Sequence, residues 1–289
     1  MNAYFRLHLS MLFFAGILIA LACTKNPFGD DDISSEAQTI HGTVSLQRDT
    51  PEGVYVWLEG FNLGTFSDTS GAFELKLPSS SRFANLTGNF HLYFFVANYA
   101  IDTASVVIHN GEVKFALGDL DENGKLNRTI HLIKLMHIKL AAKESVFDDA
   151  IPLRDIGKVA MELTFTAIKE AVTAEFPRKT EGPLCIIFMQ RISPDNDIQK
   201  MVLTNPLALE SDLASDNITT DPRYWTGSFN KRTLELPIGA YKITPYCLIH
   251  QPGLPDALVK NFCRDKNNPT IDFVNLPMKI EGGIFETYN

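Results

Sequence analysis

Residues 118–126, G-D-L-D-E-N-G-K-L, have the spacing of a calcium-binding loop. Asp119, Asp121 and Asn123 stand at positions 1, 3 and 5 of such a loop, and Gly124 supplies the sharp bend at position 6. Position 12 is Ile130, where a helix-loop-helix calcium site needs a bidentate glutamate. A tight Asn-Gly turn between strand-forming residues accounts for the same letters. Calcium binding is therefore a hypothesis that competes with a simple turn.

The stretch H-N-G-E at 109–112 matches the H-x-x-E pair of some zinc enzymes. A zinc site needs a third protein ligand and an open position. Asn110 and Gly111 between the pair are the strongest short signal for a hairpin turn. We expect a surface turn here.

Two aromatic residues, Tyr55 and Trp57, alternate with apolar residues in V-Y-V-W-L at 54–58. On a strand the valines and the leucine share one face and the aromatics share the other, about 7 Å apart. If the valine face fills a core, the aromatic pair is a candidate surface for stacking on sugar rings or anchoring a protein partner. The alternative is that both aromatics pack against a second domain or a neighbouring strand. A second aromatic spot, R-Y-W at 223–225, stands in a loop-like stretch.

Two cysteines, Cys247 and Cys263, are placed symmetrically about Pro255 in a segment that resembles two strands joined by P-G-L-P. Antiparallel pairing predicts that they face each other and form a disulfide, which stabilises a small loop by about 3 kcal/mol. Cys185, within L-C-I-I-F, is expected to be a buried apolar residue.

The first 22 residues have the features of a secretory signal, with a positive charge at Arg6, an apolar stretch at 11–21 and small residues before the cut. The stretch is too short for a membrane span, which needs about 20 residues. A-L-A-C at 20–23 resembles the lipobox of bacterial lipoproteins, in which the cysteine is acylated. The resemblance implies a lipid on Cys23, and Thr24 after it favours the outer membrane. An ordinary signal with an incidental thiol is the alternative.

Residues 23–37 are polar, with Pro, Gly and an acidic run, so we expect a flexible tether. Beyond the tether, a composition of 45% hydrophobic and 21% charged residues is typical of globular domains. The net charge of −8 argues against a nucleic-acid partner and against direct docking on anionic lipid. Membrane attachment should therefore come from the lipid.

Alternating strands dominate residues 38–118. The stretch F-S-D-T-S-G-A-F-E-L-K-L-P at 66–78 predicts a hairpin, two extended pieces joined by a turn in which Asp68 accepts backbone N–H bonds and Gly71 takes a positive φ. Together with G-T-V-S-L and P-E-G-V-Y-V-W-L-E-G, this pattern resembles the carboxypeptidase regulatory-like domain. The resemblance implies a prealbumin-type β-sandwich without catalytic residues of its own.

The second half shows no familiar family. Residues 156–176 fit either one amphipathic helix or two strands, and Thr and Phe at the centre favour strands. P-L-C-I-I-F-M at 183–189 predicts a buried strand, and T-L-E-L-P-I-G-A-Y-K-I-T-P at 233–245 predicts strand, turn, strand. The fold expected is mainly β, with a β-sandwich domain at 38–140 and a second domain, also expected to be a β-sandwich, at 141–289.

No hydrolase elbow, phosphate loop or dinucleotide fingerprint is found in the sequence. The function expected is that of a non-catalytic, lipid-anchored protein of the cell envelope that binds or scaffolds an envelope protein or polysaccharide, with no cofactor apart from the calcium hypothesis. A carbohydrate-binding accessory lipoprotein is the second hypothesis. A hydrolase whose carboxylates meet only in the folded second domain is the third.

Overall fold

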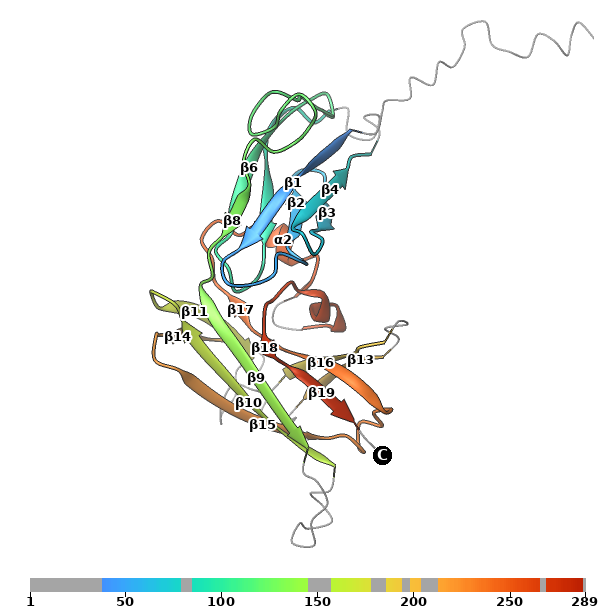
Figure 1. Cartoon of the computed structure of the whole chain (residues 1–289), viewed down its shortest axis with the longest axis vertical. Helices are drawn as coiled ribbons and strands as arrows, with labels where there is room; N and C mark the ends of the chain where they lie inside the picture. The colour runs from blue at the N-terminus through green and yellow to red at the C-terminus, as the bar shows by residue number, and fades with distance from the viewer. Residues whose placement is uncertain are drawn as a thin grey trace, which may run out of the picture.

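The structure is a computed structural model, and it describes residues 38–78, 85–144, 157–177, 186–193, 198–203, 213–265 and 269–287. The proposed signal peptide, the tether, Cys23 and Cys185 lie outside the described residues. The fold is mainly β, as the alternating sequence predicts, and its strands form sheets in two units that lie one above the other in Figure 1. No helix among the described residues is long and apolar enough to cross a membrane.

The N-terminal unit is a sandwich of two sheets. Its strands are β1 (Thr39–Leu46), β2 (Tyr55–Leu58), β3 (Leu63–Phe66), β4 (Ala72–Lys76), β5 (Gly88–Phe95), β6 (Asp102–His109), β7 (Glu112–Val113) and β8 (Ile130–Leu132). One sheet has the order β4-β1-β8 and the other β3-β2-β5-β6-β7. Their inner faces bury one apolar cluster, to which the alternate residues of both sheets contribute, among them Val54, Val56, Leu58, Phe73, Leu75 and Leu77. The period-two interpretation of these strands is confirmed.

The turn at residues 67–71 has the predicted chemistry but a different role. Asp68 Oδ1 accepts hydrogen bonds from the backbone N of Ser70 at 2.8 Å and of Ala72 at 3.0 Å. Gly71 has φ +84°, which favours glycine. Yet β3 pairs with β2 while β4 pairs with β1. The stretch is a corner that carries the chain from one sheet to the other, not a paired hairpin.

The C-terminal unit contains three sheets, of order β15-β10-β9-β18, β14-β11-β17 and β13-β12-β16-β19. The first three strands are β9 (Met136–Glu144), β10 (Lys158–Ala167) and β11 (Val172–Pro177). The others are β12 (Ile186–Arg191), β13 (Gln199–Leu203), β14 (Leu213–Ile218), β15 (Arg223–Asn230), β16 (Gly239–Pro245), β17 (Leu248–Ile249), β18 (Glu281–Gly282) and β19 (Ile284–Thr287). A short helix α2 (Asp256–Val259) and a 3-10 helix η4 (Ile271–Asn275) lie between β17 and β18.

Two local interpretations of this unit are decided by the structure. Residues 156–176 contribute strands β10 and β11, as their Thr and Phe content favoured, not a helix. The strand expected at 233–236 is absent, because these residues lie in a turn that follows β15. There, Leu234 N donates to Asn230 O at 3.2 Å and Glu235 N donates to Arg232 O at 3.0 Å.

The boundary between the units falls a few residues before the expected position at 140. Leu132 belongs to the core of the sandwich, whereas Met136 belongs to the core of the C-terminal unit. Strand β9 runs through position 140 and pairs with β10 along its whole length. The connection is therefore only the segment 133–135, and this short link holds the two units close together.

Candidate functional site

The aromatic pair of β2 lies at the junction between the units. Tyr55 is 8% exposed and Trp57 is 3% exposed, and both belong to the apolar cluster of the C-terminal unit. The Tyr55 ring meets the Phe262 ring edge-on, with centroids 4.8 Å apart. Trp57 packs against Tyr93 and donates its Nε1–H to Asn62 Oδ1 at 3.0 Å. Of the two interpretations of this pair, packing against a second domain holds and the exposed stacking surface does not, because the C-terminal unit covers this face of the sheet.

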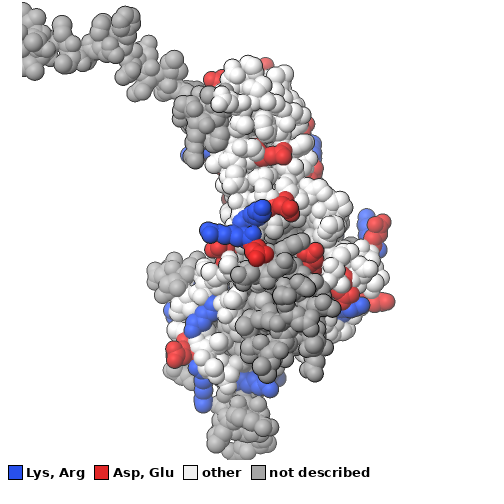
Figure 2. Space-filling model, turned by 180° about the vertical axis from the view of Figure 1, so that it is seen from behind, with Lys and Arg blue, Asp and Glu red and all other residues white. Residues whose placement is uncertain are grey.

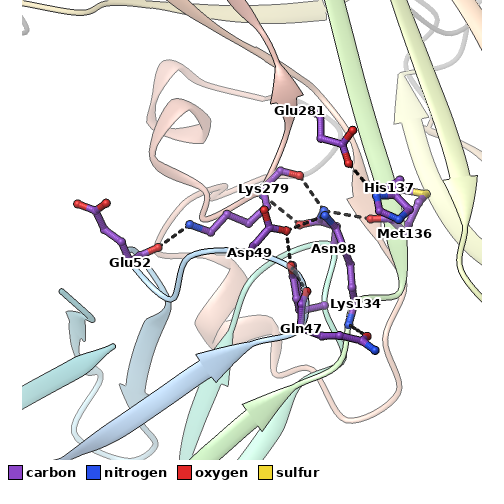
Figure 3. Close-up of polar contacts among 10 residues, drawn as sticks. Gln47, Asp49, Glu52, Asn98, Lys134, Met136, His137, Lys279 and Glu281 are labelled. Atoms are coloured by element: carbon purple, nitrogen blue, oxygen red, sulfur yellow. Dashed lines mark hydrogen bonds and ion pairs between the residues drawn. The ribbon is translucent and has the colours of Figure 1, made fainter. Parts of the chain in front are cut away.

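Beside the aromatic contact lies a polar network that follows β1 and β8 (Figure 3). The ammonium of Lys134, whose side chain is 2% exposed, donates to Asp49 Oδ2 at 2.6 Å. The Tyr99 hydroxyl donates to the same carboxylate and lies 2.9 Å from the main-chain oxygen of Gln47. The backbone N of Lys134 donates to Gln47 Oε1 at 3.1 Å. A buried charge needs such partners, and here the N-terminal unit supplies them to a lysine of the segment that links the units.

Burial and charge act against each other at Asp49. Burial alone would raise its pKa, but the hydrogen bonds from Lys134 and Tyr99 and the positive charges of Lys134 and Lys279 outweigh it and hold the pKa below the ordinary value. Burial and the neighbouring carboxylate together raise the pKa of Tyr99 far above its usual range. Asp49 therefore stays a carboxylate and Tyr99 a neutral phenol at physiological pH.

Asn98 joins the two units directly. Its Nδ2 donates to the main-chain oxygens of Met136, at 3.1 Å, and Lys279, at 2.8 Å. Its Oδ1 accepts from the backbone N of Lys279 at 3.0 Å. The side chain is fully buried, and both ends of its amide are used. An amide satisfied in this way fixes the position of its own segment relative to the two backbone segments that it touches.

Gln251 repeats the arrangement from the other side. Its Nε2 donates to the main-chain oxygen of Ala97 at 3.1 Å, and its Oε1 accepts from the backbone N of Ile101 at 2.8 Å. The backbone N of Ala97 donates in turn to Pro277 O at 2.7 Å. The segment 97–101 after β5 is thus held by residues 133–136, 251 and 277–279.

At the rim of the junction, one further contact bridges the units: Lys279 Nζ donates to the main-chain oxygen of Glu52 at 2.6 Å. Within the C-terminal unit, His137 Nδ1 on β9 lies 2.9 Å from Glu281 Oε1 on β18. Burial lowers the pKa of Lys279, and Asp49 and Glu52 oppose that shift. The whole arrangement has the chemistry of a structural joint, in which polar groups pair with one another instead of pointing toward a substrate.

The carboxylates of the calcium-loop residues accept hydrogen bonds from backbone N–H groups. Asp119 Oδ2 accepts from the backbone N of Ser105 at 2.6 Å, and Asp121 Oδ1 accepts from the backbone N of Asn123 at 2.8 Å and of Lys125 at 2.9 Å. The N–H bonds from Lys125 and Asn123 lower the pKa of Asp121. In the part of the chain that the structure describes, no group of three or more His, Cys, Asp or Glu side chains is placed to hold a metal ion. The turn interpretation explains these residues, and the spacing alone does not build a site.

The H-N-G-E stretch is the expected hairpin turn. Asn110 and Gly111 have φ of 54° and 77°, which suits a two-residue hairpin connection between β6 and β7. His109 and Glu112 are the pair that closes the hairpin. Glu112 bonds to Lys114 at 2.8 Å, so its carboxylate is engaged by a cation on the same strand end.

The predicted disulfide between Cys247 and Cys263 is wrong. Both are buried free thiols. The connection between them contains α2, so the chain does not return as the second strand of a hairpin. Cys263 Sγ instead lies 3.6 Å from the Tyr246 hydroxyl and donates to the main-chain oxygen of Asp265 at 3.3 Å. Burial raises the pKa of both thiols, which keeps them protonated and unreactive.

The second aromatic spot is not in a loop. Trp225 lies within β15, where it packs against Phe165 and Phe176 with ring centroids 4.6 Å and 4.4 Å away. Only its neighbour Tyr224 is well exposed. The two aromatic spots therefore lie in different sheets of different units and do not form one binding surface.

Sequence patterns did not identify the residues of the joint, although the sequence carries a signal for two of them. Asn98 ends the apolar run F-F-V-A-N-Y, and Lys134 interrupts H-L-I-K-L-M. A polar residue inside an apolar run is either on an exposed face or buried with partners. Nothing near Asn98 in the sequence indicates that its main partner is Lys279.

No protein-family model matches the chain, and no curated protein matches it. Among solved structures, the chain is similar to BcpA, the major pilin subunit of Bacillus cereus, with a TM-score of 0.22 and 11% identity. The match covers 73% of this chain and 66% of the pilin, slightly less than two thirds of the pilin's length.

Proposed function

We propose that the protein is a non-catalytic, lipid-anchored component of the cell envelope that acts as a rigid binding or scaffold module. The observation that supports it is the joint, in which the outer face of β2 and the buried amides of Asn98 and Gln251 are committed to holding two units together. A body of this kind presents the surfaces of its two units at fixed positions relative to each other.

The attachment follows from the sequence. The A-L-A-C motif places the acylated residue at Cys23, and the polar segment 24–37 separates it from β1. In Figure 1 the chain enters the first sheet at the outer end of the sandwich, and the C-terminal unit lies at the other end of the molecule.

The surface supports a protein partner. On the face shown in Figure 2, basic and acidic side chains are interspersed. A nucleic-acid partner requires a continuous basic surface instead. The carbohydrate hypothesis rested on Tyr55 and Trp57, which are buried, and no exposed aromatic pair replaces them among the described aromatic contacts.

Metabolic labelling with an alkyne fatty acid tests the anchor. The wild-type protein should incorporate the label and sediment with the outer membrane, whereas Cys23→Ser should lose the label. Cys247→Ser is the matched control, because that thiol is buried and should not be acylated. Wild-type protein that carries no label and stays soluble contradicts the proposal.

A further inference from the structure

Strand β15 is the longest strand at the edge of a sheet among the described residues. It ends the sheet β15-β10-β9-β18, and all 8 of its residues pair with β10 in one register without a bulge. On its other side no strand pairs with it in the part of the chain that the structure describes. In Figure 1 it is the outermost strand of that sheet. An edge of this length is a template for a further strand.

The backbone groups on the outer side of β15 have no partner among the described residues. Lys231 N donates to Gly157 O at 2.9 Å, which makes these two residues a hydrogen-bonded pair of the ladder. Hydrogen-bonded and non-hydrogen-bonded pairs alternate in an antiparallel ladder. Tyr224, Thr226 and Ser228 are therefore in non-hydrogen-bonded pairs with β10 and point their N–H and C=O groups outward. No hydrogen bond of the described residues uses these groups.

The edge also lacks the features that usually prevent pairing. Exposed edge strands in natural sheets are short, or they carry charged residues, proline or a bulge. Strand β4, at the edge of the first sheet, carries Glu74 and Lys76, and both side chains are exposed. Residues 224–230 of β15 have the sequence Y-W-T-G-S-F-N, without charge or proline. Tyr224 among them is 64% exposed.

A second copy of the same strand complements this edge. In an antiparallel pair centred on Thr226, that residue lies opposite its own copy, and threonine pairs across strands are favourable. Tyr224 then lies opposite Ser228 of the second copy. Trp225 lies opposite Gly227 of the second copy, and an aromatic ring beside a glycine stabilises a strand pair. On both faces of the sheet a large side chain thus meets a small residue.

A shift of two residues in either direction loses this match. With the pair centred on Trp225, the two tryptophans lie opposite each other and Ser228 lies opposite Pro222, which has no N–H. With the pair centred on Gly227, Trp225 lies opposite Phe229. The register centred on residue 226 opposes large to small side chains and pairs every outward N–H with an outward C=O.

We propose that β15 is a dimer interface at which a second copy of this chain docks. The two β15 strands pair antiparallel about a two-fold axis at Thr226, and the sheets of the two copies become one continuous sheet. Such an interface is isologous, since the same residues contribute from both copies. The inference goes beyond the proposed scaffold function and does not depend on the lipid at Cys23.

Disulfide cross-linking of Thr226→Cys in intact cells that produce the full-length chain tests the dimer. Opposite residues of a hydrogen-bonded antiparallel pair have Cα atoms about 5.5 Å apart, a separation that a disulfide spans. Mild oxidation should therefore convert most of this variant into a linked species of twice the chain's mass. Thr43→Cys is the matched control, because Thr43 is an exposed threonine on β1 in the other unit and should stay monomeric.

Two further variants test the register and leave Thr226 in place. Tyr224→Cys and Ser228→Cys, produced together with different tags, should link to each other, because these positions lie opposite each other in the proposed register. Each variant produced alone should stay monomeric, since its own copy lies about 13 Å away along the strand. Linking of the mixed pair supports the dimer even where Thr226→Cys fails to fold.

Three results would each overturn the proposal. The first is equal linking of Thr226→Cys and Thr43→Cys, which indicates random collision. The second is the absence of a linked dimer from both Thr226→Cys and the mixed pair. The third is an adduct whose mass is not twice that of the chain, which indicates a different partner on this edge. Linking of Tyr224→Cys alone or of Ser228→Cys alone would overturn the register.

Discussion

The side-chain amide of Asn98 bonds to both polar backbone groups of Lys279, donating to its oxygen at 2.8 Å and accepting from its N–H at 3.0 Å. The two residues are 181 positions apart and belong to different units. Two hydrogen bonds between one side-chain amide and one residue's backbone, buried at the junction, fix the relative position of the two units far more tightly than apolar contact alone.

Asn98→Ala should lower the free energy of unfolding by about 2 to 3 kcal/mol, because it leaves buried backbone groups of Met136 and Lys279 without partners. Urea denaturation measures the change. The control is Asn89→Ala, since exposed Asn89 accepts only one hydrogen bond, from Ser105 Oγ at 2.7 Å, and should cost less than about 0.5 kcal/mol. Similar losses in both variants would show that Asn98 is not part of a joint.

Asp49→Asn should destabilise the protein by about 3 kcal/mol at neutral pH, because it leaves the Lys134 ammonium buried without its counter-charge. Glu74→Gln, which removes half of the exposed pair with Lys76, should change stability by less than about 1 kcal/mol. Thermal unfolding at pH 7 compares them, and an effect of Asp49→Asn as small as that of Glu74→Gln argues against a structural role.

The same carboxylate should make the protein sensitive to acid. Its pKa in the folded state lies below its value of about 3.9 in the unfolded chain. The stability that it contributes is therefore complete above about pH 4 and is lost as the pH falls through the folded-state pKa. Below pH 4 the stability of the wild type should fall more steeply than that of Asp49→Asn. Parallel pH curves for the two proteins contradict this expectation.

Gly71→Val should destabilise the sheet-to-sheet corner strongly, because a Cβ at this position would lie 2.1 Å from the main-chain oxygen of Val44 and φ is +84°. Gly53→Val separates the two causes, since Gly53 has φ +77° but nothing lies within 4 Å of an added Cβ. We expect about 1 to 2 kcal/mol for Gly53→Val, from the backbone alone, and a clearly larger loss for Gly71→Val. Equal melting temperatures would contradict the predicted clash.

Peptide mapping without reduction should recover Cys247 and Cys263 as free thiols. In the folded protein both should react slowly with a maleimide, because they are buried and protonated, and both should react at once in urea. A peptide pair linked through the two cysteines would restore the disulfide hypothesis.

The sequence predicted the strands well where a local pattern determines them. Alternation assigned Val56 to a core and Trp57 to the opposite face, and both assignments hold. What covers Tyr55 on that face could not be predicted, because the cover includes Phe262, in a segment with no period of its own. The disulfide prediction for Cys247 and Cys263 failed for a related reason. The residues D-A-L-V after P-G-L-P form a helical turn, so the chain does not return as a second strand. Symmetric spacing of two cysteines does not determine the path of the chain between them.

The candidate site likewise contains features that local sequence determines and features that only the folded chain creates. The turns at Gly71, Gly111 and Gly124 follow from glycine and its neighbours, and all three have positive φ. The joint depends on pairs such as Asn98 with Lys279 and Gln251 with Ile101, which only the folded chain brings together. A single sequence gives the chemistry of these residues but not their partners.

The central claim is that the two units form one body, and the chain's two tryptophans test it directly, because Trp57 lies in the sandwich and Trp225 in the C-terminal unit. Trp225→Phe leaves Trp57 as the fluorescent probe, and Trp57→Phe leaves Trp225. Urea unfolding of each variant should be followed by fluorescence and by far-ultraviolet circular dichroism. We predict that within each variant the two signals change in one coincident transition. Fluorescence and circular dichroism that separate into two transitions, with one unit unfolding before the other, would contradict the account.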